Sequence, residues 1–401
     1  MKTLSYTLCA ILAAGFAFTG DAQVKPKSKK VTELKYSGRI QAQWDGIESD
    51  GTTKEDRNHF YFRRLFLGGH AKIGDNWGGD IVMDFAASPN SEGSGKGDQV
   101  FIEGASVWYK TDSFSIDIGQ KKVPFGVEET TSSSKLKAIE RSAVNRQFAE
   151  QLKFNARHTG IFAKGDLGDS GFKYDLAVVN SGQNHNSKDS GLKSGLYQYD
   201  GNELSYYGRL AYANYDSDIR YSYGAAAGVM ACDEEVSLDG AGDLNYNPAD
   251  KITAYNIFGS IGFGAFNFEA EYMTGEVSGI PNNAVDDITD GTDDTHKGYS
   301  LQASYALSNA PHGSWELLYR YSEVEGSGNS DEELISAKEI IRRANIVNSS
   351  VDRMEQHYVG VNYLFNGHDA KFMLGYEMNE LDEDGIKADA DGFRARVQFL
   401  F

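Results

Sequence analysis

Basic side chains gather in one segment of an otherwise acidic chain. The formal net charge is -19 at pH 7, yet residues 121–154 carry more basic than acidic side chains. Lysine and arginine bind anions through charge-assisted hydrogen bonds, and the planar fork of arginine can engage two oxygens at once. The segment is therefore a candidate anion-binding site. Its candidate ligands are Lys121, Lys122, Lys135, Lys137, Arg141 and Arg146.

Catalytic and metal-binding patterns are weak by comparison. The eight histidines are scattered, without a pair at helical i, i+4 spacing, and there is no Gly-x-Ser-x-Gly nucleophile motif. The acidic stretch at 286–294 could bind Ca²⁺ through its carboxylates, but it lacks the complete loop pattern and could equally be a solvated charge run. We therefore expect no enzyme activity, no cofactor and no structural metal.

The elements that must position these side chains are predicted to be β-strands. At the C-terminus, Phe393, Val397 and Phe401 fall on one face, whereas Arg394 and Arg396 fall on the other. The same period of two, with aromatics near the ends of the apolar face, recurs at 36–44 and 315–321. An apolar band between aromatic girdles, backed by a wet face, is typical of transmembrane barrels.

The connections between these segments alternate between short turns and long polar loops from Leu34 to Phe401. This alternation predicts an all-β fold, a transmembrane antiparallel up-and-down barrel of about 16 strands. A barrel of that size encloses an aqueous channel. The alternative is a soluble β-sandwich, which also has one apolar face but does not need aromatics at its strand ends.

A second set of basic residues follows from the alternation, because residues opposite the apolar faces should point into the lumen. Rings of such side chains select anions in a pore, although they could instead pair with lumenal carboxylates. These candidates are Arg39, Arg64, Arg320, Arg394 and Arg396.

The N-terminus predicts export. A basic start, an apolar run and small residues before Gln23 indicate a signal peptide at 1–22, followed by a periplasmic lead-in at 23–33 and the barrel domain at 34–401. Cleavage would remove Cys9 and leave Cys232 alone, so no intramolecular disulfide is expected. The acidic net charge argues against nucleic acid as a partner.

Several segments resemble the phosphate-selective porin family (porins O and P). The resemblance rests on Ile118–Ser133 (IGQKKVPFGVEETTSS), Ile139–Ser142 and Phe62–Gly69, with a terminal Phe401 that is similar to outer-membrane proteins generally. It implies a homotrimer in the outer membrane of a Gram-negative bacterium, in contact with lipids and lipopolysaccharide. It also implies that the third long loop, here 121–154, folds inward and that its basic residues bind phosphate.

Within that loop, apolar residues at helix-like spacing predict a helix at about 134–151, with one face on the barrel wall and its basic face toward the passage. We expect a passive porin for small anionic solutes, with phosphate or polyphosphate as the favoured cargo. The alternatives are a non-selective porin, an adhesin or receptor barrel and, with less support, an outer-membrane enzyme.

Overall fold

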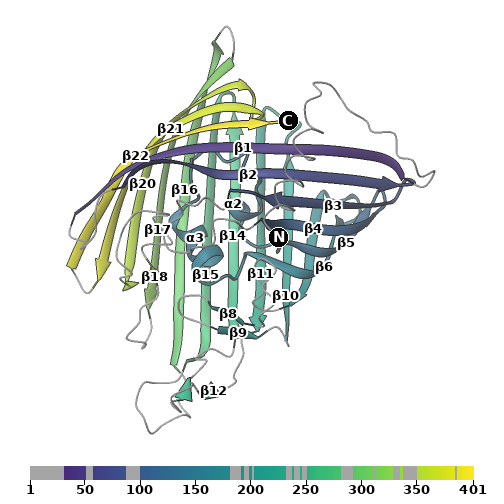
Figure 1. Ribbon diagram of the computed structural model, residues 1–401, viewed down its shortest axis with the longest axis horizontal. Coiled ribbons are helices and arrows are strands. Elements are labelled where there is room, and N and C mark those ends of the chain that lie inside the picture. The colour runs from purple at the N-terminus through teal and green to yellow at the C-terminus, as the bar shows by residue number, and fades with distance from the viewer. Residues whose placement is uncertain are drawn as a thin grey trace, which may run out of the picture.

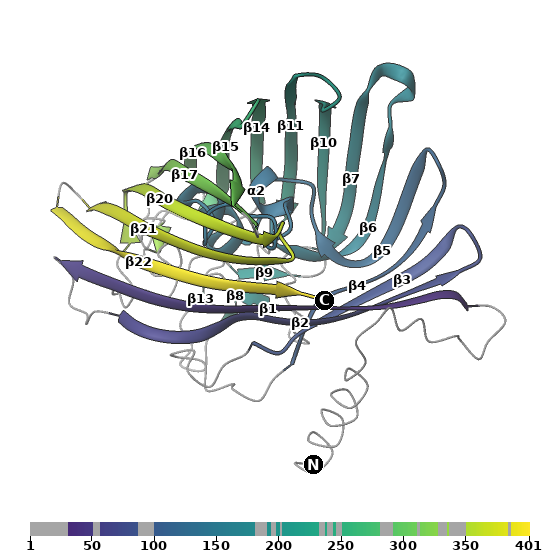
Figure 2. The ribbon, with the colours of Figure 1, turned by 90° about the horizontal axis from the view of Figure 1, so that it is seen from above.

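Long antiparallel strands close into a single barrel in the computed structural model (Figures 1 and 2). Each strand pairs with the next along the barrel, and β1 closes the ring by pairing with β22. The structure describes residues 31–50, 57–86, 100–180, 191–193, 198–200, 203–231, 237–238, 244–245, 251–280, 292–310, 313–327, 335–336, 350–383 and 386–401.

Sixteen of the described strands form the barrel, so the predicted fold class is confirmed. They are β1 (Val31–Asp50), β2 (Arg57–Ile73), β3 (Trp77–Asp84), β4 (Phe101–Lys110), β5 (Phe114–Lys122), β6 (Arg157–Asp166), β7 (Phe172–Asn180), β10 (Leu204–Asn214), β11 (Ile219–Ala231), β14 (Lys251–Phe263), β15 (Phe266–Ile280), β16 (Thr292–Ala310), β17 (Gly313–Ser327), β20 (Arg353–Asn366), β21 (Ala370–Glu383) and β22 (Ile386–Leu400).

The remaining described elements are short. Three two-stranded sheets stand apart from the barrel in the hydrogen-bond topology. The pairs are β8 (Gly191–Lys193) with β9 (Gln198–Asp200), β12 (Ser237–Leu238) with β13 (Leu244–Asn245), and β18 (Ile335–Ser336) with β19 (Ser350–Val351). The helical turns are α2 (Val127–Thr130), α3 (Ala143–Arg146), the π-helix η1 (Gln147–Gln151) and the 3₁₀ turn η2 (Gly168–Ser170).

The two faces of the barrel differ as the alternation predicts. In β22, Val397 is 54% exposed on the outside, whereas its neighbour Arg396 is 1% exposed on the inside. The outer side chains can therefore contact lipid while their neighbours point into the lumen. Among the described residues, no helix is long and apolar enough to span a membrane. The predicted signal peptide and most of the lead-in lie outside the described residues.

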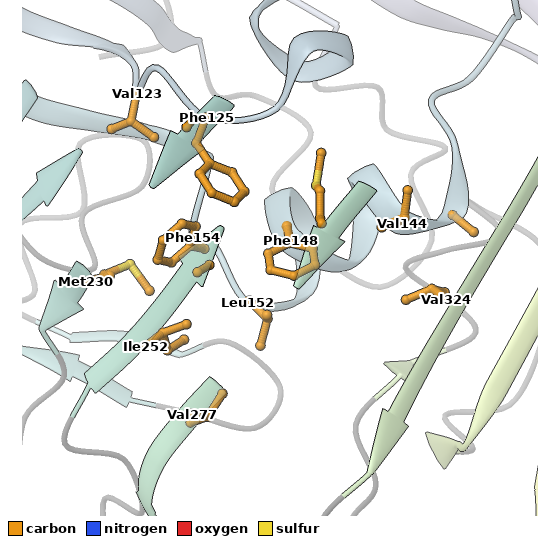
Figure 3. Packing of buried hydrophobic residues seen from close by; sticks show 14 of the residues in the cluster. Val123, Phe125, Val144, Phe148, Leu152, Phe154, Met230, Ile252, Val277 and Val324 are labelled. Atoms are coloured by element: carbon orange, nitrogen blue, oxygen red, sulfur yellow. The ribbon is translucent and has the colours of Figure 1, made fainter. Parts of the chain in front are cut away.

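The connection between β5 and β6, residues 123–156, lies inside the ring of strands, where α2 and α3 are drawn in Figure 1. Its apolar side chains Phe125, Phe148 and Phe154 form a buried cluster against inward residues of the wall such as Met230 and Ile252 (Figure 3). Burying an aromatic or aliphatic side chain contributes about 1.5–3 kcal/mol. We call this segment the lumenal segment, and its apolar cluster packs it against inward residues of the barrel wall.

The helix in the lumenal segment is shorter than the sequence predicts. Helical structure begins at Ala143 instead of about residue 134, with Ser142 as the N-cap whose hydroxyl accepts a hydrogen bond from the Asn145 amide at 3.4 Å. Before that residue, side chains of the barrel wall form hydrogen bonds with backbone carbonyls of the lumenal segment. Lys371 donates to the Leu136 carbonyl at 2.7 Å, and Asn362 donates to the Lys137 carbonyl at 2.9 Å. Because these polar groups are satisfied from the wall, the backbone does not need helical hydrogen bonds there.

Candidate functional site

Part of the lumen beside the lumenal segment is open. A cavity of about 780 Å³ lies between the lumenal segment and the inner wall formed by β1 to β7 and β10. Ten basic and six acidic residues line it, so its surface carries an excess of positive charge inside an acidic protein. The basic residues are Arg39, Arg63, Arg64, Lys121, Lys122, Arg141, Lys153, Arg157, Lys164 and Arg209. The acidic residues are Asp84, Glu103, Asp117, Glu129, Glu150 and Asp175.

Two of the predicted arginines line this cavity without a carboxylate partner among the described residues. Arg39 donates hydrogen bonds to the hydroxyls of Ser133 at 2.5 Å and Ser132 at 3.1 Å. Arg64 donates to the side-chain oxygen of Gln41 at 2.9 Å. Because neutral groups hold both guanidinium groups in place, their charges stay available to an ion in the passage.

A β-bulge places Arg64 beside a second inward arginine that the alternation did not identify. The pairing of β1 with β2 shifts between Gln41 and Ala42, so that Arg63 has no direct partner across the strands. Both Arg63 and Arg64 are consequently buried on the lumenal side. The signal in the sequence was the adjacent pair itself, since two successive charged residues can share one face of a strand only at such an irregularity.

Three further predicted ligands line the cavity with their charges partly neutralised. Lys121 contacts Asp117 at 2.7 Å, Lys122 contacts Glu129 at 2.5 Å, and Arg141 contacts the same Glu129 at 2.9 Å. Burial acts to raise the pKa of Glu129, but Arg141 and Lys122 together hold this pKa below its usual value. The carboxylate therefore stays ionised and shares its charge between two cations.

The other predicted ligands lie outside the cavity. Lys135 is exposed, whereas each of the remaining five pairs with a carboxylate of the lumenal segment or of the wall. This corrects the expectation that the helix turns its basic face to the passage, because Arg146 is only 1% exposed. The pairs are Lys137 with Glu269 at 2.9 Å, Arg146 with Glu150 at 2.7 Å, Arg320 with Glu128 at 3.0 Å, Arg394 with Asp45 at 2.7 Å and Glu377 at 2.8 Å, and Arg396 with Glu140 at 2.6 Å.

Glu140 is the centre of the buried ion pairs. It accepts hydrogen bonds from Arg63 at 2.9 Å and Arg396 at 2.6 Å, and Arg146 lies 3.9 Å away. Burial acts to raise the pKa of Glu140, but Arg63 and Arg396 hold this pKa well below its usual value. The ionised carboxylate thus ties β2 and β22 to the lumenal segment.

This network predicts how the lumenal segment responds to acid. A glutamate whose pKa is lowered in the folded state stabilises that state above its unfolded pKa of about 4.3, and this stabilisation is lost as the pH falls through the lower folded value. We therefore expect the part of the single-channel conductance that depends on Glu140, measured as the difference between the wild type and Glu140→Gln, to stay constant from pH 8 to about pH 5 and to change only below about pH 4. A conductance step between pH 6 and pH 7 that Glu140→Gln removes would contradict this assignment.

Metal binding finds no support among the residues that the structure describes, where no cluster of His, Cys, Asp and Glu is placed to hold an ion. Most of the acidic stretch at 286–294 lies outside those residues.

Comparison with known proteins agrees with this geometry. The family described as phosphate-selective porin O and P matches residues 34–401. Porin O of Pseudomonas aeruginosa is 24% identical over 460 residues, which cover 100% of this chain and 98% of that protein. Among solved structures, the outer membrane channel DcaP of Acinetobacter baumannii has a TM-score of 0.61 at 12% identity and covers 94% of this chain and 99% of its own. An anion-selective porin from Comamonas acidovorans has a TM-score of 0.58 at 12% identity, covering 92% and 99%.

Proposed function

The chain belongs to the phosphate-selective porin O and P family, and from that membership we propose that it passes inorganic phosphate and other small anions through the open part of its lumen. It is an outer-membrane porin of a Gram-negative bacterium, a channel and not an enzyme. The proposal concerns which ions the passage prefers and which residues contact them.

The observation that carries the proposal is the position of Arg39 and Arg64. Both line the cavity, and neither has a carboxylate partner among the described residues. An anion that enters loses part of its hydration, and guanidinium groups with nearby hydroxyls can replace those hydrogen bonds. The hydroxyls are present at Ser132 and Ser133, where they already fix the direction of Arg39.

Passage also requires release, and the acidic lining residues supply a reason for it. Asp117 and Glu129 form ion pairs with Lys121, Lys122 and Arg141 and partly neutralise their charges. A pore conducts when binding is favourable enough for entry and weak enough for exit. We infer a shallow series of sites along β1, β2 and β5, with Arg39 and Arg64 as the strongest.

Three further points belong to the proposal. The chain would be exported by the signal peptide at 1–22 and would assemble as a homotrimer. Its outer face would contact lipids and lipopolysaccharide, in keeping with exposed aromatics such as Trp77 and Phe393.

The proposal is tested by measuring how inorganic phosphate blocks the chloride current of the reconstituted channel. We expect phosphate to reduce the current through the wild type at lower concentrations than through Arg39→Gln or Arg64→Gln. A non-selective porin is the second candidate, because six acidic residues share the lining. It would show chloride and potassium permeating equally and no block by phosphate.

A further inference from the structure

We propose that the inner wall near the short turns carries a second binding subsite, which takes a planar aromatic ring bearing an anionic group, such as a nucleotide or an aromatic phosphate. The inference rests on the proposed function, because the ligand must be an anion that can enter the pore. It adds a feature that inorganic phosphate does not use, namely an aromatic surface.

The subsite is a cavity of about 440 Å³ that residues of β1 to β6 line. It shares Asp117, Lys121 and Lys164 with the larger cavity, so the two are consecutive parts of one passage. Its volume falls within the range of small-molecule sites, which is roughly 300–1,000 Å³. A ligand leaving the arginines would therefore meet this surface before it reaches the short turns.

Trp108 gives the subsite its aromatic surface. On the same strand, Val107 is 59% exposed on the outside, and Tyr109 lies against Trp77 with 4.9 Å between ring centroids. Tyr109 and Trp77 belong to the aromatic girdle expected on the lipid side of a barrel, and Val107 belongs to its apolar band. Trp108 lies between them on the opposite face and lines the cavity, so lipid anchoring does not account for it.

The indole ring is fixed in place before any ligand arrives. Its Nε1 donates a hydrogen bond to Asp80 at 2.6 Å, and its ring stacks on His70 with centroids 5.7 Å apart and planes inclined by 26°. His70 in turn contacts Asp80 through Nδ1 at 2.7 Å. A side chain that is already ordered loses little conformational freedom on binding.

Gly78 lets the ring lie against the wall. A Cβ atom built at Gly78 would lie 2.0 Å from Cζ2 of Trp108, which leaves no room for any side chain there. The benzo ring of the indole thus covers the backbone of the neighbouring strand. The part of the ring that the wall and His70 leave uncovered borders the cavity.

Lysines and carboxylates line the cavity around this ring in equal number, the carboxylates being Glu33, Asp75, Asp80 and Asp117. Lys72, Lys110 and Lys164 line the same cavity, and none of them forms an ion pair with a described residue. Of these carboxylates, Glu33 pairs with Lys35, Asp117 pairs with Lys121, and Asp80 is engaged by His70 and Trp108. A bound anion can contact the lysines while a ring attached to it stacks on Trp108, and such stacking strengthens binding by about tenfold.

The test compares two phosphate esters that differ only by an aromatic base, adenosine 5′-monophosphate and ribose 5-phosphate. Each is added at the short-turn side of the full-length channel in a planar bilayer, and the concentration that halves the chloride current is measured. We expect adenosine 5′-monophosphate to block at a concentration about tenfold lower, which corresponds to about 1.4 kcal/mol.

Two variants locate the effect and one controls for it. Trp108→Leu removes the ring, and Gly78→Ala keeps the ring but pushes it off the wall. Each should reduce the tenfold ratio to about one, whereas the girdle variant Trp77→Leu should preserve the ratio. Migration of the unheated protein on gels verifies that each barrel has formed.

Equal half-blocking concentrations for the two esters in the wild type would overturn the subsite, as would an unchanged ratio in Trp108→Leu. Inorganic phosphate in the same membranes tests the proposed function separately. Block by phosphate with equal block by both esters would remove only the aromatic subsite.

Discussion

Replacing both Arg39 and Arg64 by glutamate is expected to abolish the preference of the channel for anions. These arginines have no carboxylate partner among the described residues, so their charges act on the passage. The two substitutions would make basic and acidic lining residues equal in number. A unit charge 4 Å away contributes about 1 kcal/mol even in water, and four units change here. Allowing for screening by salt, we expect the permeability ratio of chloride to potassium to fall by at least about tenfold.

The double substitution of Arg39 and Arg64 by glutamine should give about half of that change in the logarithm of the permeability ratio. It removes two positive charges without adding two negative ones. Lys387→Glu is the matched control, because it makes the same reversal on an exposed residue paired with Glu380 outside the cavity. If the double glutamate variant forms a barrel and keeps the permeability ratio of the wild type, Arg39 and Arg64 do not control selectivity.

Replacing Glu140 by alanine is expected to loosen the lumenal segment and raise single-channel conductance. The substitution leaves Arg63 and Arg396 buried beside each other without their shared carboxylate. Removing one partner of a buried ion pair typically costs 3–5 kcal/mol. The barrel itself should persist, because its strands are joined by backbone hydrogen bonds around a closed ring. The lost free energy therefore weakens the docking of the lumenal segment to the wall.

Recordings from single channels in planar bilayers measure this effect directly, as a larger mean conductance with more current noise. Glu380→Ala removes an ion pair that is 58% and 42% exposed, and such surface pairs contribute only about 0–1 kcal/mol. We expect no change in that control. A Glu140→Ala channel with the conductance and noise of the wild type would show that the apolar cluster and the other polar contacts hold the segment without Glu140.

The fold was predictable because alternation is a local property of the sequence. Phe393 and Val397 on one face and Arg394 and Arg396 on the other already required a strand between lipid and water. The bulge at Arg63 was harder to predict, since it depends on the register between β1 and β2. The start of the helix at Ala143 depends on wall residues such as Lys371 and Asn362, which are more than 200 residues away in the sequence.

The docking face of the lumenal segment was present in the sequence but was not identified. Alternation places Ile252, Ala254, Met273 and Val277 on the inner face of β14 and β15, where a purely wet lumen would have polar residues. Such apolar residues require a partner inside the barrel, and Phe148 supplies it.

The roles of the individual arginines could not be predicted from one sequence. Alternation gives Arg39, Arg64 and Arg396 the same inward direction, yet Arg396 is neutralised by Glu140 and the other two have no carboxylate partner among the described residues. That difference depends on which carboxylate the lumenal segment brings to each position. It reduces the candidate anion ligands to those that line the cavity, with Arg39 and Arg64 foremost.

The central claim is that the open part of the lumen prefers anions. Its most direct test is the reversal potential of the wild-type channel across a planar bilayer with a gradient of potassium chloride. The excess of basic residues along the cavity predicts the sign for chloride permeating more readily than potassium. The opposite sign, in a channel whose barrel is intact, would contradict the account.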